Sequence, residues 1–183
     1  MDRTIRPLVI IAAFAASLAV GLATMLWATG GLRTVTAPAA IGGPFQLTDQ
    51  AGLAVTEQNL KGKPTLIFFG FTHCPDVCPT TLTEMARAQA IWQASGSDNR
   101  PKLLFVSVDP ERDTTAKIAE YAAYFHKDTL TATAAEPQLT EFTRAIGLVY
   151  MKVPQGGSNT MDHSSTLVVL NPNAEFAGII RSP

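Results

Sequence analysis

The two cysteines of this chain stand close together, and their thiols are the groups best suited to chemistry. Cys74 and Cys78 lie in the stretch Phe69-Gly-Phe-Thr-His-Cys-Pro-Asp-Val-Cys-Pro-Thr80, with three residues between them. A thiolate is a nucleophile and also a soft metal ligand, so such a pair can exchange disulfides or hold a metal ion. Two cysteines make no disulfide framework, and their closeness indicates a redox or metal-binding role.

The spacing of the pair favours chelation. Residues four apart on a helix have Cβ atoms about 5–6 Å apart, whereas a disulfide needs about 3.5–4.5 Å. A metal ion about 2.3 Å from each sulfur tolerates the wider gap. If Cys74 lies in a loop before the helix, the geometry can adjust to either use. The alternative is a pair of small core residues, against which the prolines Pro75 and Pro79 and the polar His73 and Asp76 argue.

The elements around the cysteines place them where a strand gives way to a helix. Residues 65–71 form an apolar run that predicts a buried strand. Residues 80–93 have roughly helical spacing, with inward positions at Leu82, Met85, Ala86 and Trp92 and a polar exception at Gln89. At a helix N-terminus the unpaired N–H groups lower the pKa of a thiol, so we expect reactive thiols.

The rest of the chain predicts an α/β domain. Residues 103–109 form a second continuous apolar strand, typical of a sheet covered on both faces. Further predicted elements are a hairpin over 45–55, a helix over 115–125 capped by Asp113 or Thr114, a weak strand at 130–134, a helix from Pro137 to Gly147, a strand at 148–153, a polar loop at 154–160 and closing strands at 165–170 and 176–180. This alternation predicts a mixed sheet flanked by helices, with its ligand at the carboxyl ends of the strands.

A third metal ligand is available in His163, which we expect to open the first closing strand. Alone, a histidine at a strand start is usually a surface residue. In a fold with this predicted order of strands and helices, a nearby pair of thiols makes it a candidate ligand. Two thiolates and one imidazole suit copper. Zinc accepts the same ligands but prefers a fourth in a structural site, and magnesium or calcium would want oxygen.

Several other residues are weaker candidates. His73 is expected to orient its neighbours or face a partner, Met161 could be an axial ligand, and His126 is a favourable charge at a helix C-terminus. A charged cluster follows the second strand, at the same end of the sheet as the cysteines. It either caps a helix and is solvated, or forms part of a docking surface: Asp109, Glu111, Arg112 and Asp113.

The N-terminal part predicts a membrane anchor. Residues 8–27 are apolar and uncharged, and at about 1.5 Å per residue they span roughly 30 Å, the thickness of a hydrocarbon core. Arg3 and Arg6 keep the N-terminus in the cytoplasm. The predicted order is a cytoplasmic tail at 1–7, an anchor at 8–28, a linker at 29–42 and a folded domain at 43–183. The alternative is a signal peptide cleaved near Ala37-Pro38-Ala39, although its apolar region would be shorter.

Composition excludes some classes of function. The 183 residues are 46% hydrophobic and 16% charged, with a net charge of −1. A basic nucleic-acid binder and a disordered acidic chain are both incompatible with these values, so we expect no nucleic-acid partner. Without the anchor and its flanks, roughly 140 residues remain, enough for one domain with its own core.

Three separated motifs resemble those of the SCO/SenC family of membrane-tethered copper proteins. They are Phe69-Gly-Phe-Thr-His-Cys-Pro-Asp-Val-Cys-Pro79, Val106-Ser-Val-Asp-Pro-Glu-Arg-Asp-Thr114 and Asp162-His-Ser164, in that order. The resemblance implies a thioredoxin-like fold, with Cys74, Cys78 and His163 binding Cu(I) or Cu(II). It also implies a role in assembling the CuA centre of cytochrome c oxidase, by copper delivery, by thiol reduction or by both.

The same resemblance implies the setting of the protein. The partner would be cytochrome c oxidase subunit II or another copper or thiol protein. The chain would cross the inner membrane once, through residues 8–28, with its globular domain on the periplasmic side. Thioredoxins carry a cis-proline opposite their cysteines, and here Asp162-His163-Ser164 stands at the corresponding place. Relatives continue into a further helix, and this chain ends at Pro183, so we expect a consequence for stability more than for metal binding.

Two enzymatic alternatives use the same cysteines. A thiol–disulfide oxidoreductase in an extracytoplasmic redox pathway would act through Cys74 and Cys78 by a mixed disulfide. A thiol peroxidase would need an attacking cysteine of low pKa. A metallochaperone remains the first hypothesis, and an oxidoreductase role could coexist with it.

Overall fold

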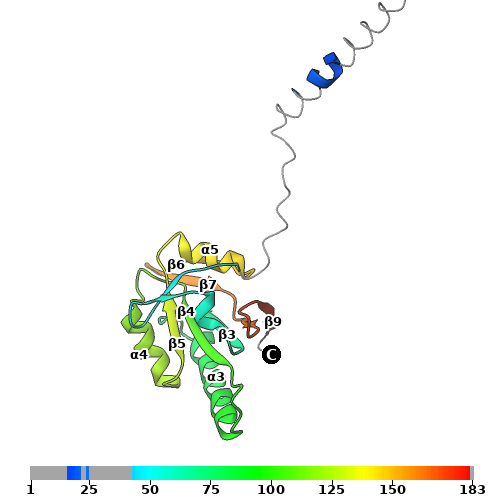
Figure 1. The fold of residues 1–183 in the computed structure, drawn as a ribbon. Coiled ribbons are helices and arrows are strands. Elements are labelled where there is room, and N and C mark those ends of the chain that lie inside the picture. Colours follow the sequence, from blue (N-terminus) through cyan, green and yellow to red (C-terminus); the bar gives the residue numbers. More distant parts are fainter. Residues whose placement is uncertain (1–15, 22–23, 25–42, 182–183) are drawn as a thin grey trace, which may run out of the picture. The chain divides into compact units, whose positions relative to one another are not determined.

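The computed structural model describes residues 16–21, 24 and 43–181 (Figure 1). The chain divides into two compact units, Met1–Pro38 and Ala39–Pro183. In the first unit, residues 16–21 and 24 are helical. The predicted tail at 1–7, the linker at 29–42 and the rest of the anchor at 8–28 lie outside the described residues. Over the ranges that are described, no helix is both long and apolar enough to cross a bilayer.

The second unit is built on a mixed sheet of seven strands in the order β2-β1-β5-β4-β3-β8-β9. Strands β3, β4 and β5 run parallel, and the outer strands pair antiparallel. The strands of this sheet are β1 Leu47–Asp49, β2 Ala54–Val55, β3 Thr65–Gly70, β4 Lys102–Ser107, β5 Leu130–Thr133, β8 Leu167–Leu170 and β9 Phe176–Ile180. A separate antiparallel pair is formed by β6 Tyr150–Gln155 and β7 Ser158–His163.

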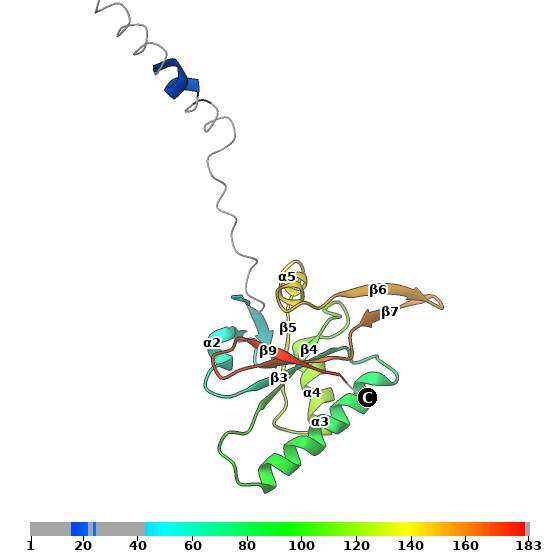
Figure 2. The ribbon, with the colours of Figure 1, turned by 90° about the vertical axis from the view of Figure 1, so that its right-hand side faces the viewer.

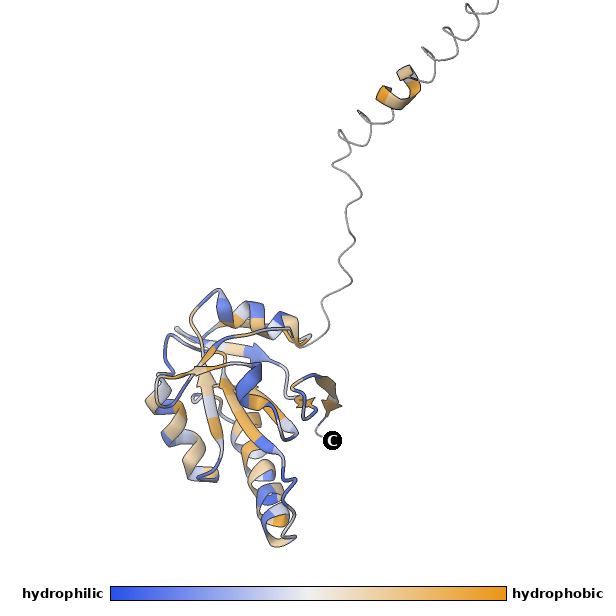
Figure 3. Ribbon diagram, viewed as in Figure 1, coloured by the Kyte–Doolittle hydropathy of each residue, from blue (hydrophilic) through white to orange (hydrophobic). Residues whose placement is uncertain are grey.

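Helices cover both faces of the sheet, as the continuous apolar strands predict (Figures 2 and 3). Successive strand residues point to opposite faces, so Phe68 stacks on Phe105 with ring centroids 5.9 Å apart, while Phe69 meets Phe142 on the other side at 5.8 Å. Phe105 in turn contacts Tyr121. The helices are α2 Glu57–Leu60, α3 Val77–Ala94, α4 Thr115–Phe125 and α5 Gln138–Ala145.

Helix α3 begins three residues before the predicted start at Thr80. Cys78 therefore lies in its first turn, and Cys74 lies in the loop between β3 and α3. The predicted inward positions Leu82 and Met85 are buried, and so is Gln89. The prediction of two cysteines at a strand-to-helix junction is confirmed.

The segment predicted as a polar loop at 154–160 is a hairpin instead. Gly156 and Gly157 have φ values of 53° and 85° and join β6 to β7. Two central residues with positive φ are what a two-residue hairpin turn requires, and glycine meets that need without strain. Strand β7 consists mainly of polar residues, so its sequence did not indicate a strand. His163 consequently ends β7, whereas we had expected it to open β8.

Candidate metal centre

The two cysteines lie side by side at the start of α3. The Cys74 N–H donates to the Phe71 carbonyl at 3.2 Å, which turns the chain out of β3. The Cys78 N–H donates to Cys74 Sγ at 3.4 Å. Cys74 is 9% exposed and Cys78 is fully buried. Both cysteines are therefore buried, and Cys74 is the more exposed of the two.

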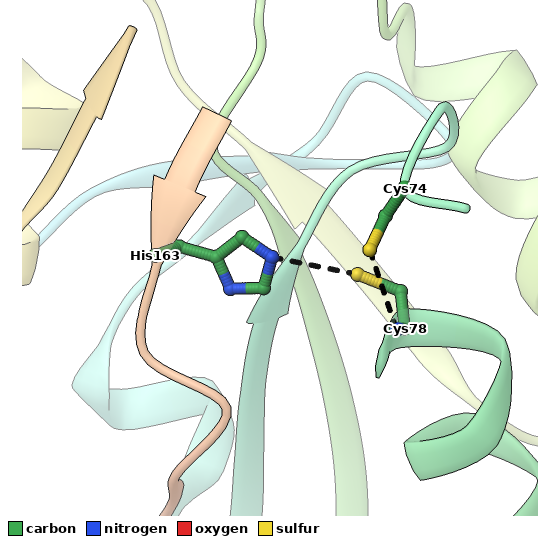
Figure 4. A group of neighbouring side chains, drawn as sticks. All are labelled: Cys74, Cys78 and His163. Carbon is green, nitrogen blue, oxygen red and sulfur yellow. Dashed lines mark hydrogen bonds between the residues drawn. The ribbon is translucent and has the colours of Figure 1, made fainter. Parts of the chain in front are cut away.

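His163 completes the group from the end of β7 (Figure 4). Its Nε2 lies 3.5 Å from Cys78 Sγ, and its Nδ1 lies 3.1 Å from the Ser164 carbonyl oxygen. Because a carbonyl can only accept, the contact assigns the proton to Nδ1 and leaves the Nε2 lone pair facing the sulfur. The Phe71 ring meets the imidazole edge-on at 5.7 Å between centroids.

The three ligand atoms all lie within 4.8 Å of one another. A metal ion takes sulfur at about 2.3 Å and imidazole nitrogen at about 2.0 Å, so small side-chain adjustments would let all three reach one ion. A soft set of two sulfurs and one nitrogen fits copper. The residues that the sequence singled out are thus brought together, although His163 comes from a distant part of the chain.

Burial sets the protonation of the metal-free site. It raises the pKa of the Cys78 thiol well above its ordinary value, and the contact with Cys74 raises it further. Burial also lowers the pKa of His163, more than its hydrogen bond to Ser164 raises it. The expectation of a thiol activated by the helix N-terminus is therefore wrong for Cys78, because loss of solvent outweighs the helix dipole. In the metal-free site the Cys78 thiol keeps its proton and the His163 imidazole is neutral. A metal ion that binds Cys78 displaces the thiol proton.

A buried carboxylate anchors the loop before Cys74. Asp113 accepts hydrogen bonds from the Thr72 N–H at 2.9 Å, from Thr72 Oγ1 at 2.6 Å and from Ser107 Oγ at 2.6 Å. It is 1% exposed and Asp109 is 2% exposed. The alternative that the charged cluster forms part of a docking surface is therefore wrong for these two aspartates. Only Glu111 points outward.

We expect Asp113→Asn to destabilise the domain by about 1–3 kcal/mol. The hydrogen bonds to a charged carboxylate are lost, and the amide nitrogen cannot accept, so a hydroxyl that now donates to Asp113 must turn round. Denaturant unfolding measures the loss. Asp98→Asn, in the exposed loop after α3, is the matched control and should change stability by no more than about 0.5 kcal/mol. Equal effects of the two substitutions would contradict the anchoring role.

The weaker candidates lie outside the three-residue group. His73 is half exposed, with its Nδ1 3.1 Å from Thr72 Oγ1 and 3.7 Å from Asp113 Oδ1. Met161 is buried on β7. His126 ends α4 and contacts Gln93. Thr114, not Asp113, caps α4, since its side chain accepts from the Lys117 N–H.

Sequence reasoning missed Gly70, the last residue of β3. A Cβ built on it would lie 2.7 Å from Cys78 Sγ. The available signal was a glycine inside an otherwise apolar strand, which often marks a close approach.

The comparisons with known proteins agree with this geometry. The family model described as SCO1/SenC matches residues 33–183. The mitochondrial SCO1 homolog 1 of Arabidopsis thaliana is 42% identical over 140 residues, which are 75% of this chain and 41% of that protein. The SCO2-like protein RC0895 of Rickettsia conorii is 35% identical over 139 residues, covering 74% of this chain and 67% of the relative. The chain thus spans less than half of the Arabidopsis relative.

Solved structures show the same fold. Arabidopsis thaliana ScoI with copper bound matches with a TM-score of 0.72 and 40% identity, over 78% of this chain and 88% of that one. Bradyrhizobium japonicum ScoI with copper bound matches with a TM-score of 0.70 and 41% identity, over 78% and 90%. The prediction of a thioredoxin-like mixed α/β fold is confirmed.

Proposed function

The chain belongs to the SCO1/SenC family, and from that premise we propose that it is a membrane-tethered copper-binding protein that assists assembly of the CuA centre of cytochrome c oxidase. The observation that carries the proposal is the convergence of the ligand atoms of Cys74, Cys78 and His163 to within 4.8 Å. Further support comes from similar proteins whose structures were solved with copper bound, among them the ScoI proteins of Arabidopsis thaliana and Bradyrhizobium japonicum.

The arrangement suits a protein that takes up copper and gives it away. Cys78 and Cys74 bind the ion as thiolates, and the proton of Cys78 leaves as the ion arrives. His163 supplies the third ligand through its free Nε2. A three-coordinate ion has room for an incoming ligand from a partner, so transfer can proceed by stepwise exchange. Cys74, the more exposed of the two cysteines, would be the last of the thiolates to hold the ion.

The proposed setting follows the sequence. Residues 8–28 anchor the chain in the inner membrane, residues 1–7 stay in the cytoplasm, and residues 29–42 tether the copper-binding domain of residues 43–183 on the periplasmic side. The acceptor we propose is cytochrome c oxidase subunit II or another copper or thiol protein. A tether of this kind would let the domain reach a membrane-embedded partner.

A second candidate function is thiol–disulfide exchange, favoured by the two free cysteines whose sulfurs lie within 4.8 Å of each other. Cys74 would attack a partner disulfide, release one partner thiolate and form a mixed disulfide. Cys78 would then displace the second thiolate and leave a Cys74–Cys78 disulfide. The raised pKa of Cys78 opposes this second step in the metal-free protein. Copper handling stands first because an imidazole converges with the two sulfurs, which disulfide exchange does not require.

The substitution His163→Ala separates the two functions. We expect the full-length chain in detergent, reduced and given one equivalent of Cu(II), to show a thiolate-to-copper charge-transfer band that His163→Ala loses. Copper affinity should fall by more than about 100-fold, since losing an outer-shell partner alone costs 10–100-fold. Absorption, EPR and competition titrations measure both effects.

The control is His126→Ala, at the end of α4, which should leave the spectrum and the affinity unchanged. Dithiol reductase activity should survive in His163→Ala, because imidazole takes no part in sulfur exchange. A charge-transfer band of wild-type position and intensity in His163→Ala would remove His163 from the ligand set. Absence of the band in the wild-type chain would sink the copper assignment and leave the oxidoreductase.

A further inference from the structure

The hairpin that carries His163 is not a member of the seven-stranded sheet. Strand β7 pairs only with β6 among the strands described. Its C-terminal end is held because residues 164–166 connect it directly to β8, which pairs with β3. The N-terminal end of β7 needs a separate attachment. Without one, the hairpin could tilt relative to the seven-stranded sheet, and His163 would move with it.

Arg112 provides that attachment. Its Nη1 donates to the main-chain carbonyl of Asn159, on β7, at 2.8 Å. Its Nε is paired with the carboxylate of the buried Asp109. Charge-assisted contacts made by a planar guanidinium fix direction as well as distance. The loop after β4 therefore holds β7 through one side chain.

The same guanidinium also reaches the wall of the metal centre. Its central carbon lies 5.8 Å from the centroid of the Phe71 ring, a cation–π distance. Phe71 is the ring that meets the His163 imidazole edge-on, at an interplanar angle of 89°. Arg112 thus contacts both the strand that carries His163 and the ring against which His163 rests.

The polar side-chain contacts that β6 makes do not duplicate this one. The Lys152–Glu111 ion pair joins exposed side chains, where such pairs contribute little. The Tyr150 hydroxyl donates to Glu136 and so ties β6, not β7, to the segment before α5. On β7 itself, Met161 is buried in the apolar core, and Arg112 makes the hydrogen bond to the end of the strand away from His163.

We propose that Arg112 is a positioning residue that sets the approach of the His163 imidazole to the two sulfurs. The inference rests on the proposed function in one respect: the affinity readout assumes that His163 binds copper. Asp109 orients the guanidinium, and Arg112 transmits that orientation to β7 and Phe71. The main-chain contact with Asn159 makes the effect independent of the side chain at that position.

Arg112→Lys is the informative substitution. Removing the positive charge altogether would leave Asp109 buried without a partner, which is strongly destabilising. A lysine keeps a positive charge beside Asp109. Its single ammonium is not planar, however, and cannot contact both the Asn159 carbonyl and the Phe71 ring at once, as the guanidinium does. The matched control is Arg87→Lys, the same change on the exposed side of α3.

The first measurement needs no copper. The chemical shifts of the His163 ring protons depend on the nearby Phe71 and Phe68 rings, 5.7 and 6.4 Å away between centroids. We expect Arg112→Lys to move these NMR shifts in the metal-free protein and Arg87→Lys to leave them in place. Unchanged His163 shifts in Arg112→Lys would overturn the inference.

The second measurement is a double-mutant cycle on copper affinity, using the full-length chain in detergent. Arg112→Lys should weaken binding about tenfold, the scale for an outer-shell residue. If Arg112 acts through His163, the same substitution should have no further effect in a His163→Ala background. A tenfold loss that persists there would show a general effect on the fold and overturn the inference.

The failure of the proposed function has a different signature. In that case the wild-type chain itself would show no tight copper binding. The ring-proton shifts would then still decide whether Arg112 places His163, because that measurement requires no metal.

Discussion

Cys78→Ser should abolish tight copper binding, with a larger loss of affinity than His163→Ala. The sulfur is fully buried, 3.5 Å from His163 Nε2 and next to Cys74, so it lies at the centre of the ligand set. Serine offers a hard, protonated oxygen in place of a soft thiolate, and copper favours the latter. The loss should therefore exceed about two orders of magnitude. An anaerobic titration of Cu(I) against a chromophoric chelator measures it.

A second substitution separates the ligand from the packing. Serine also buries a hydroxyl in an apolar site, which costs about 1–3 kcal/mol if it finds no partner. Cys78→Ala leaves no polar atom to satisfy and should bind copper as poorly as Cys78→Ser while folding better. Tight copper binding by folded Cys78→Ala would remove Cys78 from the site. Cys74→Ser should lose copper binding in the same way.

Gly70→Ala should damage the site without touching a ligand. The added Cβ would lie 2.7 Å from Cys78 Sγ and 2.9 Å from Cε2 of Phe105, distances that native packing does not tolerate. The strand, the first turn of α3 and the Phe105 ring all belong to the core, so one of them must move. We expect a loss of about 1–3 kcal/mol in unfolding free energy from overpacking, together with weaker copper binding as Cys78 is displaced.

The measurements are denaturant unfolding and copper titration of the same preparation. Gly43→Ala is the matched control, because a Cβ there meets no atom within 4 Å, and it should behave as wild type. Wild-type stability and copper affinity in Gly70→Ala would mean that Cys78 is less tightly confined than its contacts indicate.

The sequence was sufficient to predict most of the individual strands and helices. The apolar runs at 65–71 and 103–109 became β3 and β4 because a strand buried on both faces must be apolar throughout. The helix expected at 115–125 has those bounds. The hairpin at 45–55 formed around an Asp49 side chain that accepts from two main-chain N–H groups. In each case the signal lies within neighbouring residues.

Contacts between residues far apart in the sequence could be seen only in the tertiary structure. The polar strand β7 has no continuous apolar pattern, so neither its hairpin nor the place of His163 at its end could be predicted. The raised pKa of Cys78 reflects burial by the whole fold, which overrides the local helix terminus. Asp113 and Arg112 resembled a solvated cluster, yet they hold the cysteine loop and the β7 strand. Sequence determined which residue types are available for a copper site. Only the tertiary structure decided their distances, because those depend on how the β6–β7 hairpin packs beside the start of α3.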